Sequence, residues 1–195
     1  FSSGISGFSH YKFGNVNKKL LIALAIPGVI GAVSGSLLLV YLGNEYETIT
    51  YAVLATYTLI IGIRLIVLAF QKKIKKKKVK NVSFLGFSGG FLDAFGGGGW
   101  GPVVTSTLLS KGKKSNIVVG TVSLAEFFVT LSASITFFVT LGVSHGFIIA
   151  GLIIGGALAS PIAAKLAGKI PQKAAILAVA FLVIVFSIRI LMKII

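Results

Sequence analysis

SGGFLDAFGGGGWGPVVTSTLL, residues 88–109, is a glycine-rich run set inside a strongly apolar segment. Four glycines are followed by Trp-Gly-Pro, and an acid, Asp93, lies three residues before the first of the four. In lipid every backbone N–H and C=O needs a partner, so a broken helix is tolerated only where it lines a cavity or is buried in protein. A glycine run at membrane depth therefore predicts a binding site rather than a simple crossing.

The composition indicates a polytopic membrane protein. Hydrophobic residues make up 55% of the chain and charged residues 12%, and the mean hydropathy is +0.99, values outside the range of soluble domains. The formal net charge is +15, but the lysines lie between apolar spans, which is typical of cytoplasmic loops and not of a nucleic-acid surface. The absence of cysteine excludes disulfides and thiolate metal sites, and His10 and His145 form no metal-binding pattern.

A helix needs about 20 apolar residues to cross a bilayer. Four segments meet this length, and a fifth, residues 147–166, is rich in glycine and interrupted by Pro161. The four are residues 20–42, 48–70, 117–141 and 174–191. Residues 1–11 resemble the end of a further helix. Residues 82–109 are split by the glycines into two pieces, and each piece is too short to cross alone.

Lysine placement predicts how the split segment runs. The basic stretch 72–80 is expected in the cytoplasm, and so are Lys111, Lys113 and Lys114. Both ends of residues 82–109 then lie on one side of the membrane, which makes the segment a re-entrant hairpin. The acidic loop 44–47 and the lysine-free turn 142–145 are expected outside.

The sequence also repeats itself. Residues 1–67 align with residues 128–192, and the charges of their connecting loops are reversed, as inverted-topology repeats require. We therefore predict an all-α membrane helix bundle of two inverted repeats. Its parts are the first repeat (1–71), a basic cytoplasmic linker (72–81) and the second repeat (82–195) with its hairpin at 82–110. The first repeat's own glycine-rich hairpin is expected to precede residue 1.

The hairpin predicts an anion site. Pro102 is expected to begin a short helix that reaches Leu109, because proline is favoured in a first helical turn. Free amides at a helix start bind anions, and glycine lets the backbone approach the ligand closely. Trp100 is expected to wall or gate the pocket. The predicted substrate-binding residues are Gly96, Gly97, Gly98, Gly99, Trp100, Gly101, Thr105 and Ser106. The alternative is that the glycines only let helices pack closely.

Asp93 and Glu126 are the acids expected inside the membrane, where acids are costly and often belong to proton pathways. Both are candidates for coupling transport to protons. For Asp93, an ordinary role as hydrogen-bond acceptor at the glycine turn is an equal alternative. The hydroxyl-rich helix around residues 121–134 suits either close packing or a polar lining, and Arg64 and Arg189 are expected to reach the interface.

Three stretches resemble the TauE/SafE sulfite exporter family of bacterial and archaeal membrane transporters. They are residues 89–109, residues 120–131 (GTVSLAEFFVTL) and residues 3–16 (SGISGFSHYKFGNV). The resemblance covers essentially the whole chain, although family members are typically longer. It implies movement of small sulfur-containing anions, such as sulfite, sulfoacetate or related sulfonates, across the cytoplasmic membrane. It also maps the family's glycine segment to residues 96–101 and its helix acid to Glu126.

The leading hypothesis is therefore a multi-pass secondary transporter of the cell membrane that exports small sulfur-containing anions. A passive anion channel and a transporter of another small anion are the alternatives. An enzyme is not expected, since an intramembrane aspartic protease needs two aspartates and Asp93 stands alone. No cofactor, metal or nucleic acid is expected. The expected partners are the anion and membrane lipid, and a homodimer is left open.

Overall fold

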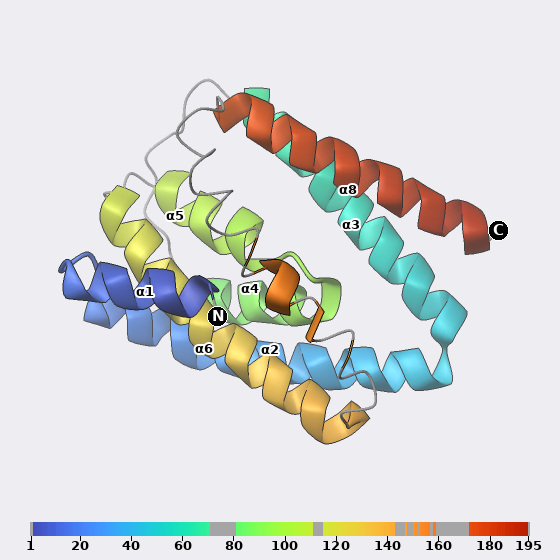
Figure 1. The fold of residues 1–195 in the computed structure, drawn as a ribbon, viewed down its shortest axis with the longest axis horizontal. Helices are drawn as coiled ribbons and strands as arrows, with labels where there is room; N and C mark the ends of the chain where they lie inside the picture. Colours follow the sequence, from blue (N-terminus) through green and yellow to red (C-terminus); the bar gives the residue numbers. More distant parts are fainter. Residues whose placement is uncertain are drawn as a thin grey trace.

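The computed structural model describes residues 2–70, 81–110, 115–142, 147, 150–151, 153–156, 158 and 172–194, and the elements in that part are helices (Figure 1). They are α1 (Ser2–Lys12), α2 (Lys18–Glu45), α3 (Glu47–Phe70), α4 (Val82–Gly96), η1 (Trp100–Thr105), α5 (Ser106–Ser110), α6 (Ser115–Leu141) and α8 (Gln172–Ile194). The prediction of an all-α chain is thus confirmed for the described residues.

Four of these helices, α2, α3, α6 and α8, are long and apolar enough to cross a membrane. They correspond to the four predicted spans, and each begins and ends within a few residues of the predicted limits. The 15-residue α4 belongs to the shorter apolar helices, as the split segment predicted. The fifth predicted span, residues 147–166, and the basic stretch 72–80 lie largely or wholly outside the described residues.

The tightest packing joins α2 and α4, whose backbones touch through glycines. A Cβ added at Gly90 would run into the carbonyl of Gly28, and one added at Gly86 would lie 2.6 Å from the carbonyl oxygen of Leu24. Gly86 meets Leu24, and four residues later Gly90 meets Gly28, so the contacts follow in the same order along both helices. The α2 and α4 helices therefore run parallel. The α2 helix is also the most enclosed of the four long helices, with 39% of its most apolar window buried, against 11% for α8.

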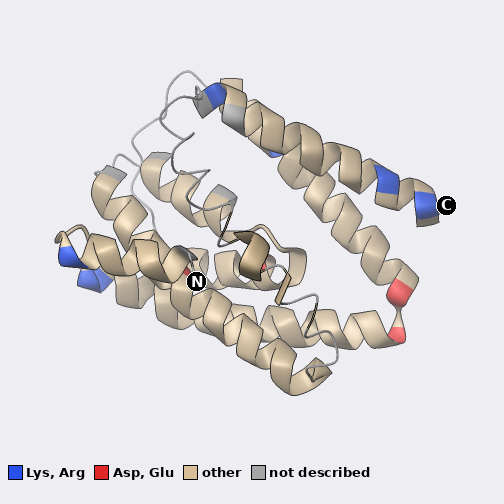
Figure 2. Ribbon diagram, in the orientation of Figure 1, with Lys and Arg blue, Asp and Glu red and all other residues tan. Residues whose placement is uncertain are grey.

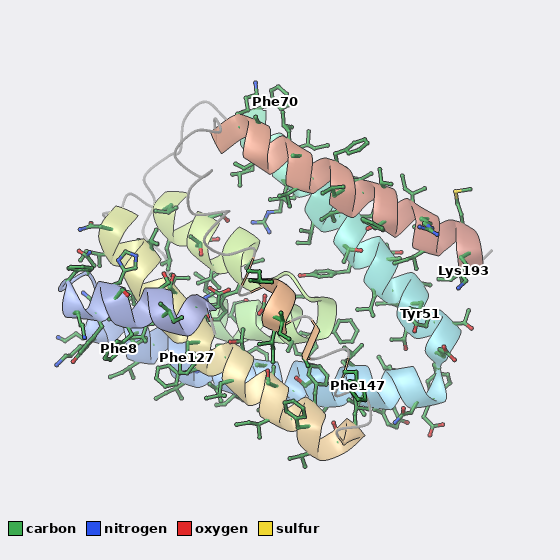
Figure 3. The ribbon with its side chains drawn as sticks, viewed as in Figure 1. Phe8, Tyr51, Phe70, Phe127, Phe147 and Lys193 are labelled. Atoms are coloured by element: carbon green, nitrogen blue, oxygen red, sulfur yellow. The ribbon has the colours of Figure 1, made fainter. Side chains whose placement is uncertain are left out.

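Helices α3 and α8 form an antiparallel pair (Figure 1). Near mid-length, Thr58 Oγ1 and Ser187 Oγ are hydrogen-bonded at 2.8 Å. Where α3 ends and α8 begins, the Lys173 ammonium lies 4.0 Å from the centroid of the Phe70 ring, at the end that Figure 3 marks with Phe70. The two helices, more than one hundred residues apart in sequence, therefore meet along their lengths.

Helices α1 and α6 form a second antiparallel pair. A Cβ added at Gly7 of α1 would lie 2.6 Å from Cα of Leu124, and one added at Gly120 of α6 would lie 2.8 Å from Cβ of His10. Beyond α1, the backbone N–H of Asn17 donates to the buried hydroxyl of Thr121 at 2.9 Å. The hydroxyl of Thr121 therefore fixes the start of α2 to α6, and it is a packing residue and not part of a polar lining.

The charges follow the ends of the helices. Figure 2 shows most of the blue at helix ends and a pair of red segments at the corner where α2 meets α3. That corner contains Glu45 and Glu47, separated by the single residue Tyr46, whose N–H donates to the carbonyl of Leu42. Apart from Arg64 of α3 and Glu126 of α6, the long helices carry their charges near their ends, which is the pattern expected of membrane spans.

Candidate functional site

The helix break lies at Gly97–Gly99, between α4 and η1. Gly97 ends α4 in the left-handed conformation, with φ of 69°, and its N–H donates to the carbonyl of Asp93 at 2.9 Å. Glycine suits this position because side chains with a Cβ are disfavoured there. The next residues fold back on α4, since a Cβ added at Gly99 would lie 2.6 Å from the backbone nitrogen of Asp93 and one added at Gly89 would clash with Val104. The segment is therefore broken at the predicted glycines, and its second part packs on its first.

Asp93 holds this turn together. Its Oδ1 accepts hydrogen bonds from the backbone N–H groups of Gly99 and Trp100, each at 3.0 Å. A carboxylate at the start of a helical turn pairs with N–H groups that have no helical partner and with the positive end of the helix. The expectation that the Gly99 amide is free for a ligand is thus wrong. Of the two roles considered for Asp93, the structure shows that of hydrogen-bond acceptor at the glycine turn.

Trp100 is a core residue and not a wall or gate. Its side chain is fully buried, and the indole Nε1–H donates to the carbonyl oxygen of Val122 on α6 at 3.1 Å. It packs in one apolar cluster with residues such as Leu24 of α2 and Val129 of α6. The expectation that Trp100 walls or gates the pocket is therefore wrong. A buried indole is stabilised by a hydrogen-bond partner for its N–H, and α6 provides one.

The second arm also begins earlier than predicted. A π-helical turn, η1, starts at Trp100 and continues into α5, whereas the sequence predicted a helix beginning at Pro102. Because Asp93 pairs with the amides of Gly99 and Trp100, helical geometry is stabilised two residues before the proline. Single π-turns occur frequently at functional sites in proteins.

A cavity of about 570 Å³ adjoins the turn. It lies between α2, α3, α4, α6 and α8, so it is built from parts that are distant in sequence. Its lining residues are Leu39, Tyr51, Leu54, Ala55, Thr58, Asp93, Ala94, Phe95, Gly96, Gly97, Thr130, Ala133, Ser134, Phe137 and Ile190.

The predicted site residues divide into two groups around this cavity. Asp93, Gly96 and Gly97 line it. The other predicted residues do not appear in its lining, namely Gly98, Gly99, Trp100, Gly101, Thr105, Ser106 and Glu126. Glu126 is half-buried on α6, one turn before the lining residue Thr130, and its charge interacts with that of Asp93. The structure thus brings both predicted acids to one region, next to the turn.

The polar lining consists of hydroxyl groups and one carboxylate. Thr130 and Ser134 each donate to a carbonyl one turn back in α6, at 2.8 to 2.9 Å, and the Thr58 hydroxyl is within hydrogen-bond distance of the Leu54 carbonyl and the Ser187 hydroxyl. These hydroxyls therefore present oxygen lone pairs to the cavity. In the part of the chain that the structure describes, Asp93 is the charged residue of the lining, and neither Lys nor Arg contributes to it.

The sequence did not predict the contribution of α3 and α8. The missed lining residues on these helices are Tyr51, Leu54, Ala55, Thr58 and Ile190. A signal was present in Thr56, Tyr57 and Thr58, three consecutive polar residues in the middle of the span. Nothing in the apolar residues distinguishes a cavity-facing Leu54 or Ile190 from a lipid-facing one.

Comparison with known proteins identifies the family of this chain. Residues 1–190 match the family described as "Sulfite exporter TauE/SafE". The chain is 40% identical over 192 residues to "Probable membrane transporter protein YtnM" of Bacillus subtilis (strain 168), covering 94% of this chain and 64% of that protein. The chain thus spans a little under two thirds of the length of this relative. No solved structure matches it.

Proposed function

The chain belongs to the sulfite exporter TauE/SafE family, and from this premise we propose that it works as a secondary transporter that exports small sulfur-containing anions across the cell membrane. Sulfite, sulfoacetate and related sulfonates are the substrate class that we propose. The family and the name of the relative from Bacillus subtilis both indicate membrane transport rather than catalysis.

The observation that supports this function best is the cavity of about 570 Å³ at the broken helix. Its volume lies within the roughly 300–1,000 Å³ of small-molecule sites, and its walls combine apolar surface with a few polar groups, as such sites do. Five helices contribute to it, so a relative movement of any of them changes access to the cavity. We propose that the anion binds here, beside Gly96 and Gly97, instead of on the amides of Gly99 and Trp100.

We further propose that α4, η1 and α5 form a re-entrant hairpin in the membrane. The 15 residues of α4 are fewer than the about 20 needed to cross a bilayer, and η1 packs back on α4. Membranes tolerate irregular backbone where it lines a cavity or is buried in protein. Gly96 and Gly97 line the cavity, and the amides of Gly99 and Trp100 are paired with Asp93.

The inverted repeat remains part of the proposal, and the helix pairs support it. The alignment of residues 1–67 with residues 128–192 makes α3 the counterpart of α8. It also makes α1 the counterpart of the second half of α6. Counterparts related by a two-fold axis in the membrane plane run in opposite directions. The antiparallel pairing of the counterparts α3 and α8 is the arrangement that such an axis produces. The α1 helix is also antiparallel to α6, although it packs on the first half of α6, at Leu124 and Gly120.

For energy coupling we propose Glu126 as the proton-carrying acid and Asp93 as the group that maintains the turn. Asp93 uses one carboxylate oxygen for two backbone hydrogen bonds. Only backbone groups of Glu126 take part in the described hydrogen bonds. The described residues that line the cavity include neither Lys nor Arg. A proton that enters the cavity with the anion would therefore offset the negative charge that the anion brings next to Asp93.

The proposed function is tested by the thermal stability of the purified full chain in detergent. A ligand that binds the native state raises the unfolding temperature by mass action. We expect stabilisation by at least one of sulfite, sulfoacetate, thiosulfate and taurine, rising with concentration, and none by chloride at the same ionic strength. Equal behaviour in all these salts would contradict the proposal.

A further inference from the structure

Tyr57 of α3 has an unusual position for a buried phenol. Its hydroxyl oxygen is shielded from solvent and has no hydrogen-bond partner within the part of the chain that the structure describes. Buried tyrosine hydroxyls normally have a partner, because an unpaired buried polar group is destabilising. An orphan hydroxyl beside a cavity therefore indicates a group whose partner is a ligand.

The ring of Tyr57 is held against the helix break. A Cβ added at Gly96 would clash with the edge of the Tyr57 ring, so only glycine leaves room for the phenol there. Gly96 lines the cavity, and so does Thr58, the residue that follows the tyrosine in α3. Tyr57 thus lies directly behind the cavity wall at the junction of α3 and α4.

The charges around the phenol are Asp93 and Arg64. Both act on it electrostatically, Asp93 from the other side of the junction and Arg64 from two turns further along α3. The hydroxyl hydrogens of Thr130 and Ser134 are directed to carbonyls of α6, and that of Thr58 is directed to the Leu54 carbonyl or to the Ser187 hydroxyl. Among the residues that the structure describes, the Tyr57 hydroxyl has no such acceptor, so its hydrogen is available to an incoming oxyanion.

We infer that the Tyr57 hydroxyl is a substrate-binding donor: it gives its hydrogen to an oxygen of the bound sulfur oxyanion when the contact between α3 and Gly96 opens. The inference rests on the proposed function. It adds to that function a named donor on α3, opposite the glycine turn. It also explains why a tyrosine and not a phenylalanine occupies an apolar contact with Gly96.

The test is the affinity of the purified full chain for sulfite and sulfoacetate, measured by titration of the unfolding temperature. Tyr57→Phe keeps the ring on Gly96 and removes only the hydroxyl. We expect a dissociation constant roughly tenfold higher, the loss expected for one hydrogen bond to a charged acceptor. Without added anion, the unfolding temperature should equal or exceed that of the wild type, because no internal hydrogen bond is lost.

The control is Tyr41→Phe, which removes a hydroxyl from an exposed tyrosine of α2 outside the cavity lining. Its affinity should match the wild type. If the wild type binds the anions and Tyr57→Phe binds them equally well, the inference is overturned and the proposed function stands. If Tyr57→Phe lowers the unfolding temperature without anion, the hydroxyl has a structural partner, and the inference is again overturned. If the wild type itself responds to no anion, the proposed function fails, and the inference fails with it.

Discussion

The carboxylate of Asp93 and the backbone amide of Gly99 are joined by a 3.0 Å hydrogen bond across the break between α4 and η1. The same oxygen also accepts from the next amide along the chain. An internal carboxylate thus occupies the anion-binding position that the glycine run suggested. This displaces the candidate substrate site from the amides to the adjacent cavity.

The first prediction concerns Asp93. Asp93→Ala should destabilise the protein by about 3–6 kcal/mol, because two backbone N–H groups lose an acceptor and hydrogen bonds to charged groups contribute roughly 1.5–3 kcal/mol each. Asp93→Asn keeps a side-chain oxygen that accepts from the same amides, so its loss should be clearly smaller. Thermal unfolding in one detergent compares the two variants. Equal losses would mean that the hydrogen bonds do not hold the turn.

The second prediction compares two glycines of the same run. Gly96→Ala should destabilise by about 1–3 kcal/mol, because the added methyl overpacks against the Tyr57 ring. A Cβ added at Gly98 meets nothing within 4 Å, so Gly98→Ala should change stability by less than about 0.5 kcal/mol. Unfolding temperatures measure both changes. The opposite order would show that α3 does not pack on the break.

The third prediction uses two buried hydroxyls. Thr121 accepts the backbone N–H of Asn17, so Thr121→Val, which keeps the shape, should destabilise by about 0.5–1.5 kcal/mol because this hydrogen bond between α6 and the start of α2 is lost. The hydroxyl of Ser36 is buried and has no partner among the described residues, so Ser36→Ala should be neutral or stabilising. A loss of stability in Ser36→Ala would reveal a partner for this hydroxyl.

The fourth prediction concerns coupling. In proteoliposomes, an imposed proton gradient should drive sulfite accumulation by the wild type. Glu126→Gln should abolish this accumulation while it preserves sulfite exchange at equal pH, because the amide binds no proton in this range. Thr136→Val, which removes a hydroxyl of α6 outside the cavity lining, is the control for damage to the helix. Gradient-driven accumulation by Glu126→Gln at the wild-type level would exclude this acid from coupling, and gradient-independent flux in the wild type would favour a channel.

Much of the fold is predictable from the sequence because long apolar runs bounded by charges need no knowledge of their neighbours. The span expected at residues 20–42 is observed as α2, Lys18–Glu45, and the break falls at the expected glycines. The position of Asp93, three residues before the glycine run, also predicts that it lies within reach of the turn, but it leaves two roles open for this residue. The choice between them depends on the coordinates of the amides of Gly99 and Trp100.

The rest of the site depends on contacts between distant segments. Trp100 is buried because a carbonyl of α6 accepts its indole N–H, and no spacing within residues 88–109 encodes that partner. The cavity likewise needs Thr58 of α3 and Ile190 of α8, which meet α4 only through the packing of whole helices. Apolar periodicity is the same for helix faces toward lipid and toward a neighbour, so it cannot identify these residues.

The binding of radiolabelled sulfite to the purified full chain tests the central claim, that the cavity beside Gly96 and Gly97 holds the anion. The variant is Ser134→Phe, which places a large ring in the cavity from an exposed position of α6. Ile135→Phe, at the neighbouring exposed position outside the lining, is the control. The account predicts saturable binding in the wild type and in Ile135→Phe and its loss in Ser134→Phe. Undiminished binding by a correctly folded Ser134→Phe would contradict it.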